Sequence, residues 1–353
     1  MFVYWSMFAF PALFALVTGP RTDQRNTLNT VGLIFVFLLF ALVIGLRYEI
    51  GADWFTYEII VGYTAYEDFF DALGSGDPGF SFVAWTMSRL GLAVWGPNLV
   101  CGTILVTGIL KFCRRQDDLW LALTASVPYL VIVVGMGYVR QAAAIGFILI
   151  ALNNFERAAF ARSVAWLLAA ALFHASAVCV APLFALAIAR KRVLLIIPVG
   201  IATAVLFAVL LSSRIDTFYE NYVVAEYDSS GAMIRLLMNA VPALIFLAYR
   251  KHFPGSDWAR AQWLLFSILS LIMVGAVAVS SSTTVIDRVG LYFIPIQLYV
   301  FGNLAVAMRL TDRGRFFVTV GAVVYYTAIL FVWLNYATHA EYWLPYRFAP
   351  FEL

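Results

Sequence analysis

Apolar runs close to membrane length recur from one end of the chain to the other, separated by short polar stretches. A helix needs about 20 predominantly apolar residues to cross the hydrocarbon core of a bilayer. The short alternating pattern that marks the strands of a membrane β-barrel is absent. The predicted spans are 2–18, 31–46, 97–112, 119–137, 141–155, 193–211, 232–249, 259–279, 289–308 and 316–335.

Two further segments are apolar but irregular. Residues 80–94 are amphipathic, and residues 163–188 are long but interrupted by His174 and Pro182. With these segments included, we expect about ten to twelve membrane segments. The sequence therefore predicts an all-α, polytopic transmembrane protein that forms a single integral membrane domain over residues 1–353.

The composition supports this fold class and excludes others. The chain is 63% hydrophobic and 12% charged, whereas soluble domains carry about 25% charged residues. A net charge of +3 does not indicate nucleic-acid binding, and three widely spaced cysteines predict neither a disulfide framework nor a metal site. The first apolar run lacks a basic leader and an obvious cleavage site, so we interpret it as a retained helix rather than a signal peptide.

Clusters of Lys and Arg set the predicted orientation, because short basic loops stay in the cytoplasm. Placing every cluster inside leaves the N-terminus and the loops 47–79, 212–231 and 336–353 outside. Residues 80–94 are then not a full crossing, and residues 163–188 return to the side they left as a shallow broken hairpin. The clusters are Arg21/Arg25, Lys111/Arg114/Arg115, Arg157/Arg162, Arg190/Lys191/Arg192, Arg250/Lys251 and Arg309/Arg313/Arg315.

Charged and aromatic residues gather directly after the second span, in the stretch LRYEIGADWFTYE at 46–58. Gly51 permits a turn there. Asp53 and Tyr57 are four residues apart, so they share a face if the segment is helical. Arg47 stands at the outer end of the span, and a planar guanidinium binds phosphate through two parallel hydrogen bonds. The competing interpretation is an interfacial helix with ordinary ion pairs.

Polar residues inside or at the start of apolar segments are further candidates. Arg140 and Gln141 begin a span followed by small residues, which let helices approach closely. Because exposing an Arg to lipid is costly, we expect Arg140 to face a cavity or a partner rather than to snorkel. His174 is either a hydrogen-bonded structural residue or a base that titrates near neutral pH. Asp287 and Arg288 either pair with each other, cap a helix or bind phosphate.

The C-terminal stretch NYATHAEYWLPYRF, residues 335–348, places His339 among aromatic rings. Such aromatic platforms hold sugars in some proteins and lie among lipid headgroups in others. The chain contains no P-loop, no GxSxG, no HExxH and no dense carboxylate cluster of the kind that a metal site needs. We therefore expect neither a metal nor another cofactor.

Taken in order, these motifs resemble the EpsG family, which contains Wzy-like exopolysaccharide polymerases of bacteria. The resemblance covers nearly the whole chain. One departure is Asp77, where Glu is common in the family, and Asp and Glu should serve alike there. The motifs are RYxxGxDxxxY from Arg47 to Tyr57, DPGF at Asp77, VRQ from Val139 to Gln141, FHASA from Phe173 to Ala177, DRxxxYF from Asp287 to Phe293 and a Trp-rich WxPY ending at Tyr346.

This resemblance implies a membrane fold similar to that of GT-C, Wzy and O-antigen-ligase enzymes, in the bacterial inner membrane with the active site facing the periplasm. The implied reaction polymerises oligosaccharide repeat units carried on undecaprenyl pyrophosphate, with the lipid pyrophosphate as leaving group and without metal or nucleotide sugar. The implied partners are this lipid-linked oligosaccharide, the lipid bilayer, and flippase and chain-length or export proteins, but no nucleic acid.

A pyrophosphate that leaves without a metal needs fixed positive charge where negative charge develops. We therefore predict His174, Asp53 and Arg140 as catalytic residues, with either His174 or Asp53 as the base for the acceptor hydroxyl. The predicted substrate-binding residues are Arg47, Tyr57, Gln141, Asp287, Arg288 and His339.

Other functions fit parts of the same layout. A ligase would pass a finished glycan to a different acceptor, and an acyltransferase would decorate sugars, although the usual histidine signature of the latter is not evident. A transporter or flippase would explain polar groups at membrane depth, but it predicts two related halves with interrupted helices, and no convincing repeat is visible. A structural partner in a secretion complex would not need arginines at the ends of spans.

Overall fold

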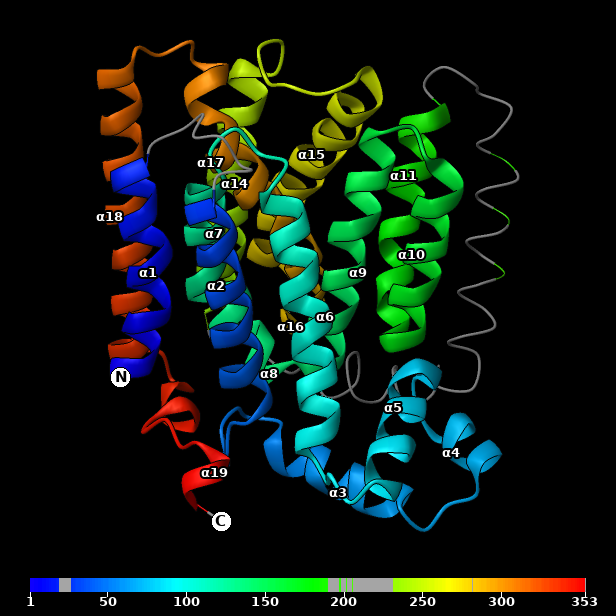
Figure 1. Ribbon diagram of the computed structural model, residues 1–353. Coiled ribbons are helices and arrows are strands. Elements are labelled where there is room, and N and C mark those ends of the chain that lie inside the picture. The colour runs from blue at the N-terminus through cyan, green and yellow to red at the C-terminus, as the bar shows by residue number, and fades with distance from the viewer. Residues whose placement is uncertain are drawn as a thin grey trace.

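In the computed structural model the chain forms a bundle of long helices with several short helices at one end (Figure 1). The structure describes residues 1–18, 27–189, 231–280 and 282–352, and the single residues 197, 201 and 205. Within these ranges the secondary structure is helical, apart from one isolated bridge between Arg47 and Phe348. The predicted all-α, polytopic membrane fold is confirmed.

Seven helical stretches of the described chain are long and apolar enough to cross a membrane. Three other apolar helical stretches are shorter: α1 (Phe2–Thr18), α10 (Phe160–Phe173) and Ala175–Ala187, which joins a 3₁₀ helix to most of α11 (Ala181–Ala189). The seven are α2 (Thr27–Gly45), α6 (Trp95–Cys113), α7 to α8 (Leu119–Gly137), α14 (Ala232–Tyr249), α15 (Asp257–Val279), α16 to α17 (Thr284–Ala307) and α18 (Asp312–Tyr336).

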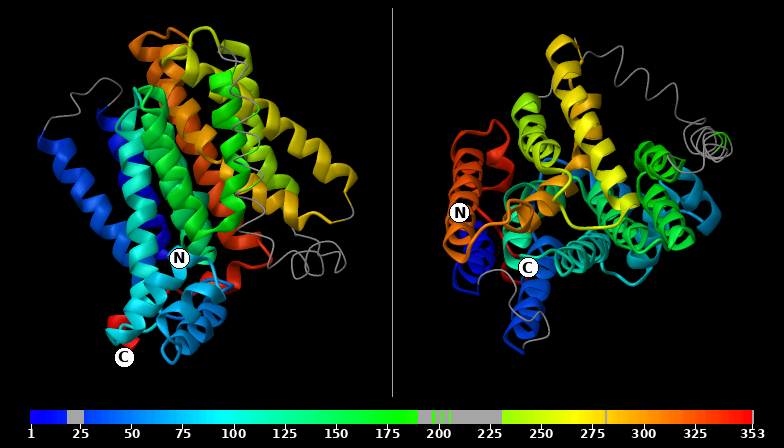
Figure 2. Two further views of the ribbon diagram at one scale, coloured as in Figure 1. Left: turned by 90° about the vertical axis from the view of Figure 1, so that its right-hand side faces the viewer. Right: turned by 90° about the horizontal axis from the view of Figure 1, so that it is seen from above.

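The predicted spans agree with these helices. The predicted span 141–155 corresponds to α9 (Val139–Glu156), and span 2–18 to α1. The predicted span 193–211 and the basic clusters at 21–25 and 190–192 lie outside the described residues. Seen end-on, α1 and α18 lie side by side at one edge of the bundle, and α10 and α11 lie near the opposite edge (Figure 2).

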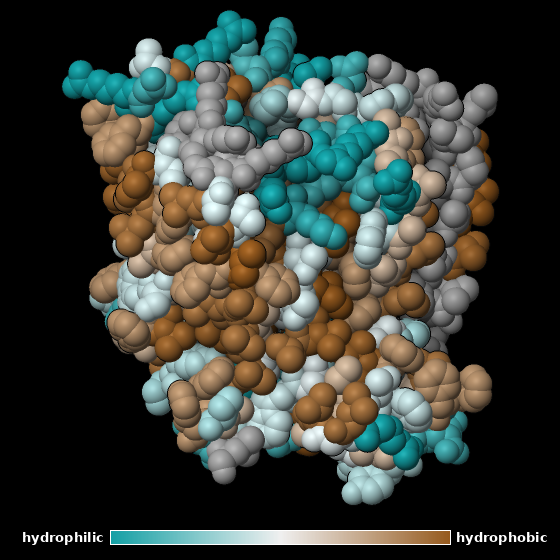
Figure 3. Space-filling view, viewed as in Figure 1, coloured by the Kyte–Doolittle hydropathy of each residue, from teal (hydrophilic) through white to brown (hydrophobic). Residues whose placement is uncertain are grey.

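The bundle has two chemically different ends. The basic end, at the top of Figure 1, carries the Lys- and Arg-rich loops that follow α6, α9, α14 and α17. The loop end, opposite to it, carries α3 (Trp54–Thr64), α4 (Phe69–Ser75), α5 (Pro78–Arg89) and α19 (Ala349–Glu352). A broad apolar belt separates hydrophilic side chains at the two ends of the visible face (Figure 3). This layout is that of a protein embedded in a bilayer.

The irregular segments 80–94 and 163–188 follow the paths predicted from the charge pattern: the first does not cross the membrane, and the second returns to the end at which it started. With 12 residues, α5 is too short to cross a hydrocarbon core of about 30 Å. The ring of Phe155 lies 5.3 Å from that of Phe160 and 5.0 Å from that of Phe184. The segment between them therefore leaves and returns at the same level of α9, as a hairpin.

The hairpin is nevertheless not shallow, which corrects the prediction. α10 ends at Phe173, and His174 at the turn lies with its Nδ1 3.5 Å from the carboxylate of Asp77, which precedes α5 at the loop end. Pro182 does not cause the break, because it occupies the first turn of α11, where a missing N–H is tolerated. The hairpin thus brings a histidine to the loop end.

Small residues bring α6 and α9 together, as predicted for the residues after Arg140. A Cβ atom on Gly146 would lie 2.7 Å from the carbonyl oxygen of Ile104. Gly51 has a φ of +101°, and a Cβ there would collide with the carbonyl oxygen of Met136. Its N–H donates to the carbonyl of Tyr342 at 2.9 Å. The predicted turn therefore exists, and it is held against the C-terminal segment.

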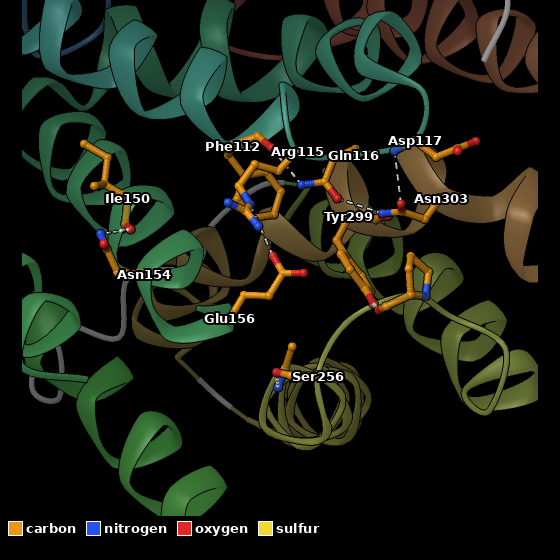
Figure 4. A network of polar contacts seen from close by, with 12 residues as sticks. Phe112, Arg115, Gln116, Asp117, Ile150, Asn154, Glu156, Ser256, Tyr299 and Asn303 are labelled. Carbon is orange, nitrogen blue, oxygen red and sulfur yellow. Dashed lines mark hydrogen bonds and ion pairs between the residues drawn. The ribbon is translucent and has the colours of Figure 1, made fainter. Parts of the chain in front are cut away.

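A buried polar network holds the basic end together (Figure 4). Asn303 of α17 (Pro295–Ala307) donates from Nδ2 to Oε1 of Gln116 at 2.7 Å and to the carbonyl of Tyr299 at 2.8 Å. Its Oδ1 accepts the backbone N–H of Asp117 at 3.2 Å. Arg115, in the same loop, forms an ion pair with Glu156 at the end of α9. The loop after α6 is thereby fixed to two other helices.

Candidate active site

A cavity of about 310 Å³, here called the loop-end cavity, is lined by segments that are far apart in the sequence. They are the start of α3, the residue before α5, the start of α9, the turn after α10, and α16 (Thr284–Gly290). The lining residues are Asp53, Thr56, Tyr57, Asp77, Tyr138, Arg140, Gln141, His174, Ala175, Ser176, Val285, Arg288 and Val289.

The carboxylate of Asp77 connects two of these segments. Its Oδ2 accepts a hydrogen bond from Nη1 of Arg140 at 2.8 Å and lies 3.5 Å from Nδ1 of His174. Its Oδ1 accepts the backbone N–H of Ala175 at 3.2 Å. With the Asp77 side chain only 3% exposed, this buried carboxylate holds Arg140 and the backbone of Ala175, and His174 lies beside it.

Arg140 has both a partner and access to the cavity, as its place at the start of a span predicted. Besides its bond to Asp77, its guanidinium carbon lies 5.8 Å from the ring centre of Tyr57 and 5.9 Å from that of Phe80. These distances fit cation–π contacts. The guanidinium is therefore held between a carboxylate and two aromatic rings, and 29% of the side chain remains exposed.

Arg288 reaches the cavity from α16. Its guanidinium carbon lies 4.1 Å from the ring centre of Tyr138, and its backbone carbonyl accepts a 2.7 Å hydrogen bond from Nε2 of Gln141. Asp287 does not pair with Arg288. Its two carboxylate oxygens accept 2.7 and 2.8 Å hydrogen bonds from Arg235 of α14, outside the lining of the cavity. Asp287 and Arg288 thus contact different neighbours, although they are adjacent in the sequence.

Asp53 and Tyr57 share one face at the start of α3, and both line the cavity, as their spacing predicted. Within the described part of the chain, the Asp53 carboxylate forms no ion pair. Burial raises the pKa of this carboxyl above its usual range, and the positive charges of Arg288 and Arg140 partly oppose that rise. Asp53 therefore lies in the electrostatic field of both guanidiniums.

Like Asp287, two other predicted substrate ligands lie outside the lining of the cavity. Arg47 is fully buried, and it donates to the carbonyls of Ile50 (3.0 Å) and Ile44 and to Oδ1 of Asn98 (3.2 Å). Its guanidinium holds the end of α2 rather than facing the cavity. His339 is exposed on the C-terminal segment, with its ring 6.1 Å from that of Tyr342, and it does not line the cavity.

Some lining residues were not among the predicted site residues. Asp77 stood out in the sequence only as part of DPGF, and no spacing rule connects it to Arg140 or His174. Tyr138 and Ser176 were likewise not predicted. In the structure, Ser176 Oγ lies 2.8 Å from the hydroxyl of Tyr292. As for metals, the described residues contain no group of three or more His, Cys, Asp or Glu side chains arranged to hold an ion.

Comparison with known proteins adds one finding to this geometry. The model of the EpsG family matches residues 31–348. This range includes every segment that lines the loop-end cavity. No curated protein and no solved structure matches the chain.

Proposed function

Because the chain belongs to the EpsG family, which takes part in bacterial exopolysaccharide biosynthesis, we propose that it is a Wzy-type polysaccharide polymerase. Its substrate is an oligosaccharide repeat unit carried on undecaprenyl pyrophosphate. A hydroxyl of the acceptor unit attacks the anomeric carbon of the donor and gives its proton to a base. The bond from that carbon to the pyrophosphate oxygen breaks, and the lipid pyrophosphate leaves with the bonding electrons.

The observation that carries this proposal is the convergence of Arg140 and Arg288 on one cavity that also holds a histidine and two carboxylates. A guanidinium binds phosphate oxygens in pairs of parallel hydrogen bonds. Fixed cations placed where negative charge develops lower the barrier for departure of an anion. Arg140 is already oriented by Asp77, and Arg288 by its contact with Tyr138. The leaving group therefore binds between these two side chains.

Two lining groups are candidates for the base, and the geometry favours His174. Its Nδ1 faces the carboxylate of Asp77, which leaves Nε2 as the nitrogen that serves the cavity. A carboxylate beside Nδ1 orients an imidazole and stabilises its protonated form. Asp53 is the alternative, but both arginines act on it electrostatically. We place Asp53 closer to the pyrophosphate, where it receives hydrogen bonds from hydroxyls of the donor sugar.

The position of the cavity fits a reaction outside the cytoplasm. It lies toward the loop end, opposite the basic loops, which the positive-inside rule assigns to the cytoplasm. We therefore place the active site at the periplasmic side of the inner membrane, where it receives lipid-linked donors from a flippase. Donor and acceptor sugars bound in the cavity displace water from it, which favours transfer to a sugar hydroxyl over hydrolysis.

A chain-length assay tests the proposal. Purified protein in nanodiscs receives the organism's undecaprenyl-pyrophosphate repeat unit, with EDTA and without nucleotide sugar, and the products are resolved as a ladder. Arg140→Lys keeps the charge but loses the paired donors, so we expect chain growth to slow on the order of 100-fold. The control is Arg89→Lys, because Arg89 is exposed at the same end and does not line the cavity.

Three outcomes contradict parts of the proposal. A ladder that Arg140→Lys leaves unchanged would remove Arg140 from the pyrophosphate site. Chain growth that EDTA abolishes and a divalent metal restores would show that the reaction needs a metal. A repeat unit that stays unmodified in the presence of folded protein would direct attention to a ligase that lacks its acceptor, or to transport.

A further inference from the structure

A second cavity, of about 470 Å³, lies at the basic end and takes no part in the proposed reaction. Its wall is formed by the end of α11, the loop that follows α14, and the first turns of α15. We call it the basic-end cavity. Its described lining residues are Ala187, Arg250, Lys251, Asp257, Trp258, Arg260, Ala261 and Leu264.

The charge of this wall is predominantly positive. Arg260 is held in place, because Nη1 donates to the carbonyl of Gly255 at 3.0 Å and Nη2 to Oδ1 of Asp257 at 2.7 Å. Asp257 is the one acid among the described lining residues, and Arg260 matches its charge. Arg250 and Lys251 follow the last residue of α14, and both are exposed. They give the wall an excess of two positive charges that can meet an anion.

The rest of the wall is apolar and aromatic. Ala187, Ala261 and Leu264 contribute hydrocarbon surface from two helices. The ring of Trp258 lies 5.7 Å from that of Phe160 in an edge-to-face arrangement. Tryptophan is enriched where a membrane meets water, because its ring is apolar and its N–H is polar. A ligand suited to this wall therefore carries an anionic group next to an apolar group.

We propose that the basic-end cavity binds an anionic phospholipid of the leaflet that surrounds the basic end. The phosphodiester lies against Arg250 and Lys251, and the acyl chains pass along Leu264 toward the apolar belt. Basic pockets between transmembrane helices bind anionic lipid headgroups in this way, through charge and hydrocarbon contacts together. A free phosphate would use only the charged part of the wall. The proposal is independent of the polymerase reaction.

The test compares two double variants of the full-length protein in detergent, and lipid retention is measured by native mass spectrometry. Arg250→Gln/Lys251→Gln removes two cations from the cavity. The matched control, Arg309→Gln/Arg313→Gln, removes two exposed cations from the same end that do not line it. We expect wild type and control to retain phosphatidylglycerol over phosphatidylcholine, and the first variant to bind it roughly tenfold more weakly.

Thermal unfolding gives a second measurement of the same site. Phosphatidylglycerol should raise the Tm of the wild type and of the control variant, but not that of the Arg250→Gln/Lys251→Gln variant. Equal losses in both double variants would overturn the proposal in favour of diffuse surface charge. An equal rise of the Tm with inorganic phosphate or with phosphatidylcholine would overturn it as well, because neither combines a negatively charged headgroup with acyl chains. Every variant residue is exposed, so folding is not at stake.

Discussion

At the scale of single residues, the buried carboxylate of Asp77 is the group on which the proposed active site depends most. It receives hydrogen bonds from Arg140 of α9 and from the backbone of Ala175, and it faces His174. Removing one partner of a buried ion pair leaves the other charge without compensation. The side chain therefore affects both the stability of the protein and the placement of two proposed functional residues.

We predict that Asp77→Asn lowers the free energy of unfolding by roughly 3 kcal/mol and also slows chain growth, because Arg140 loses its charged partner. Asp77→Glu keeps the charge and should retain more of both properties. Thermal unfolding and the chain-length assay measure the two effects separately. If Asp77→Asn changed neither quantity, Asp77 would have no part in positioning Arg140 or His174.

Asp53 leads to a prediction about pH. Because burial raises its pKa in the folded protein, the ionised carboxyl costs stability at neutral pH, and the protonated form does not. Asp53→Asn should therefore raise the Tm at neutral pH, and this gain should shrink as the pH falls through the pKa of the folded state. The Asp53→Asn variant should also extend chains more slowly than the wild type, since the neutral amide is a weaker hydrogen-bond acceptor than the carboxylate.

The control for this pH series is Asp71→Asn, because Asp71 is an exposed acid of α4 at the same end of the bundle and lies outside the cavity. It accounts for the loss of one negative charge. A gain in Tm at Asp53 that does not depend on pH would contradict the electrostatic explanation and would indicate altered packing instead.

At the scale of elements, the close approach of α6 and α9 fixes the helix that carries Arg140 and Gln141 into the proposed site. We predict that Gly146→Ala lowers the free energy of unfolding by about 1–3 kcal/mol, because its Cβ would lie 2.7 Å from the carbonyl oxygen of Ile104. Gly275→Ala in α15 is the matched control, since nothing lies within 4 Å of a Cβ there. Thermal unfolding of both variants measures the difference, and equal Tm values would show that α9 can shift without cost.

The hairpin formed by α10 and α11 carries residues of its turn to the proposed active site. Two neighbouring apolar helices return to the same end of the bundle, and the break between them carries His174 and Ser176 into the loop-end cavity. Backbone that leaves the helical conformation at membrane depth is tolerated where it lines a cavity. The interruption at His174 is therefore consistent with its proposed role as a base.

At the scale of the whole molecule, the two cavities lie at opposite ends and have different chemistry. The loop-end cavity combines arginines with carboxylates and a histidine, which suits a reacting pyrophosphate-linked sugar. The basic-end cavity combines surplus positive charge with hydrocarbon and tryptophan, which suits a lipid that is bound but not changed. The proposed lipid site and the proposed active site are thus separated by the length of the bundle.

The sequence by itself determined the helical spans, the turn at Gly51 and the interruption at His174. Each of these follows from local chemistry: the length of an apolar run, a residue without a side chain, or a polar residue within an apolar segment. The sequence also showed Arg140, Gln141 and Arg288 at the ends of spans and Asp53 shortly after one, where polar groups either meet a cavity or reach water.

Only the tertiary structure decided which of these groups meet. Asp77 contacts Arg140 and His174, and Asp287 pairs with Arg235 rather than with its neighbour. Arg47 is buried against backbone carbonyls although its position in the sequence resembled that of a ligand. The physical reason is that local pattern sets the depth of a residue in the membrane, whereas its partners depend on how helices rotate and pack, and that packing arises from contacts between distant segments.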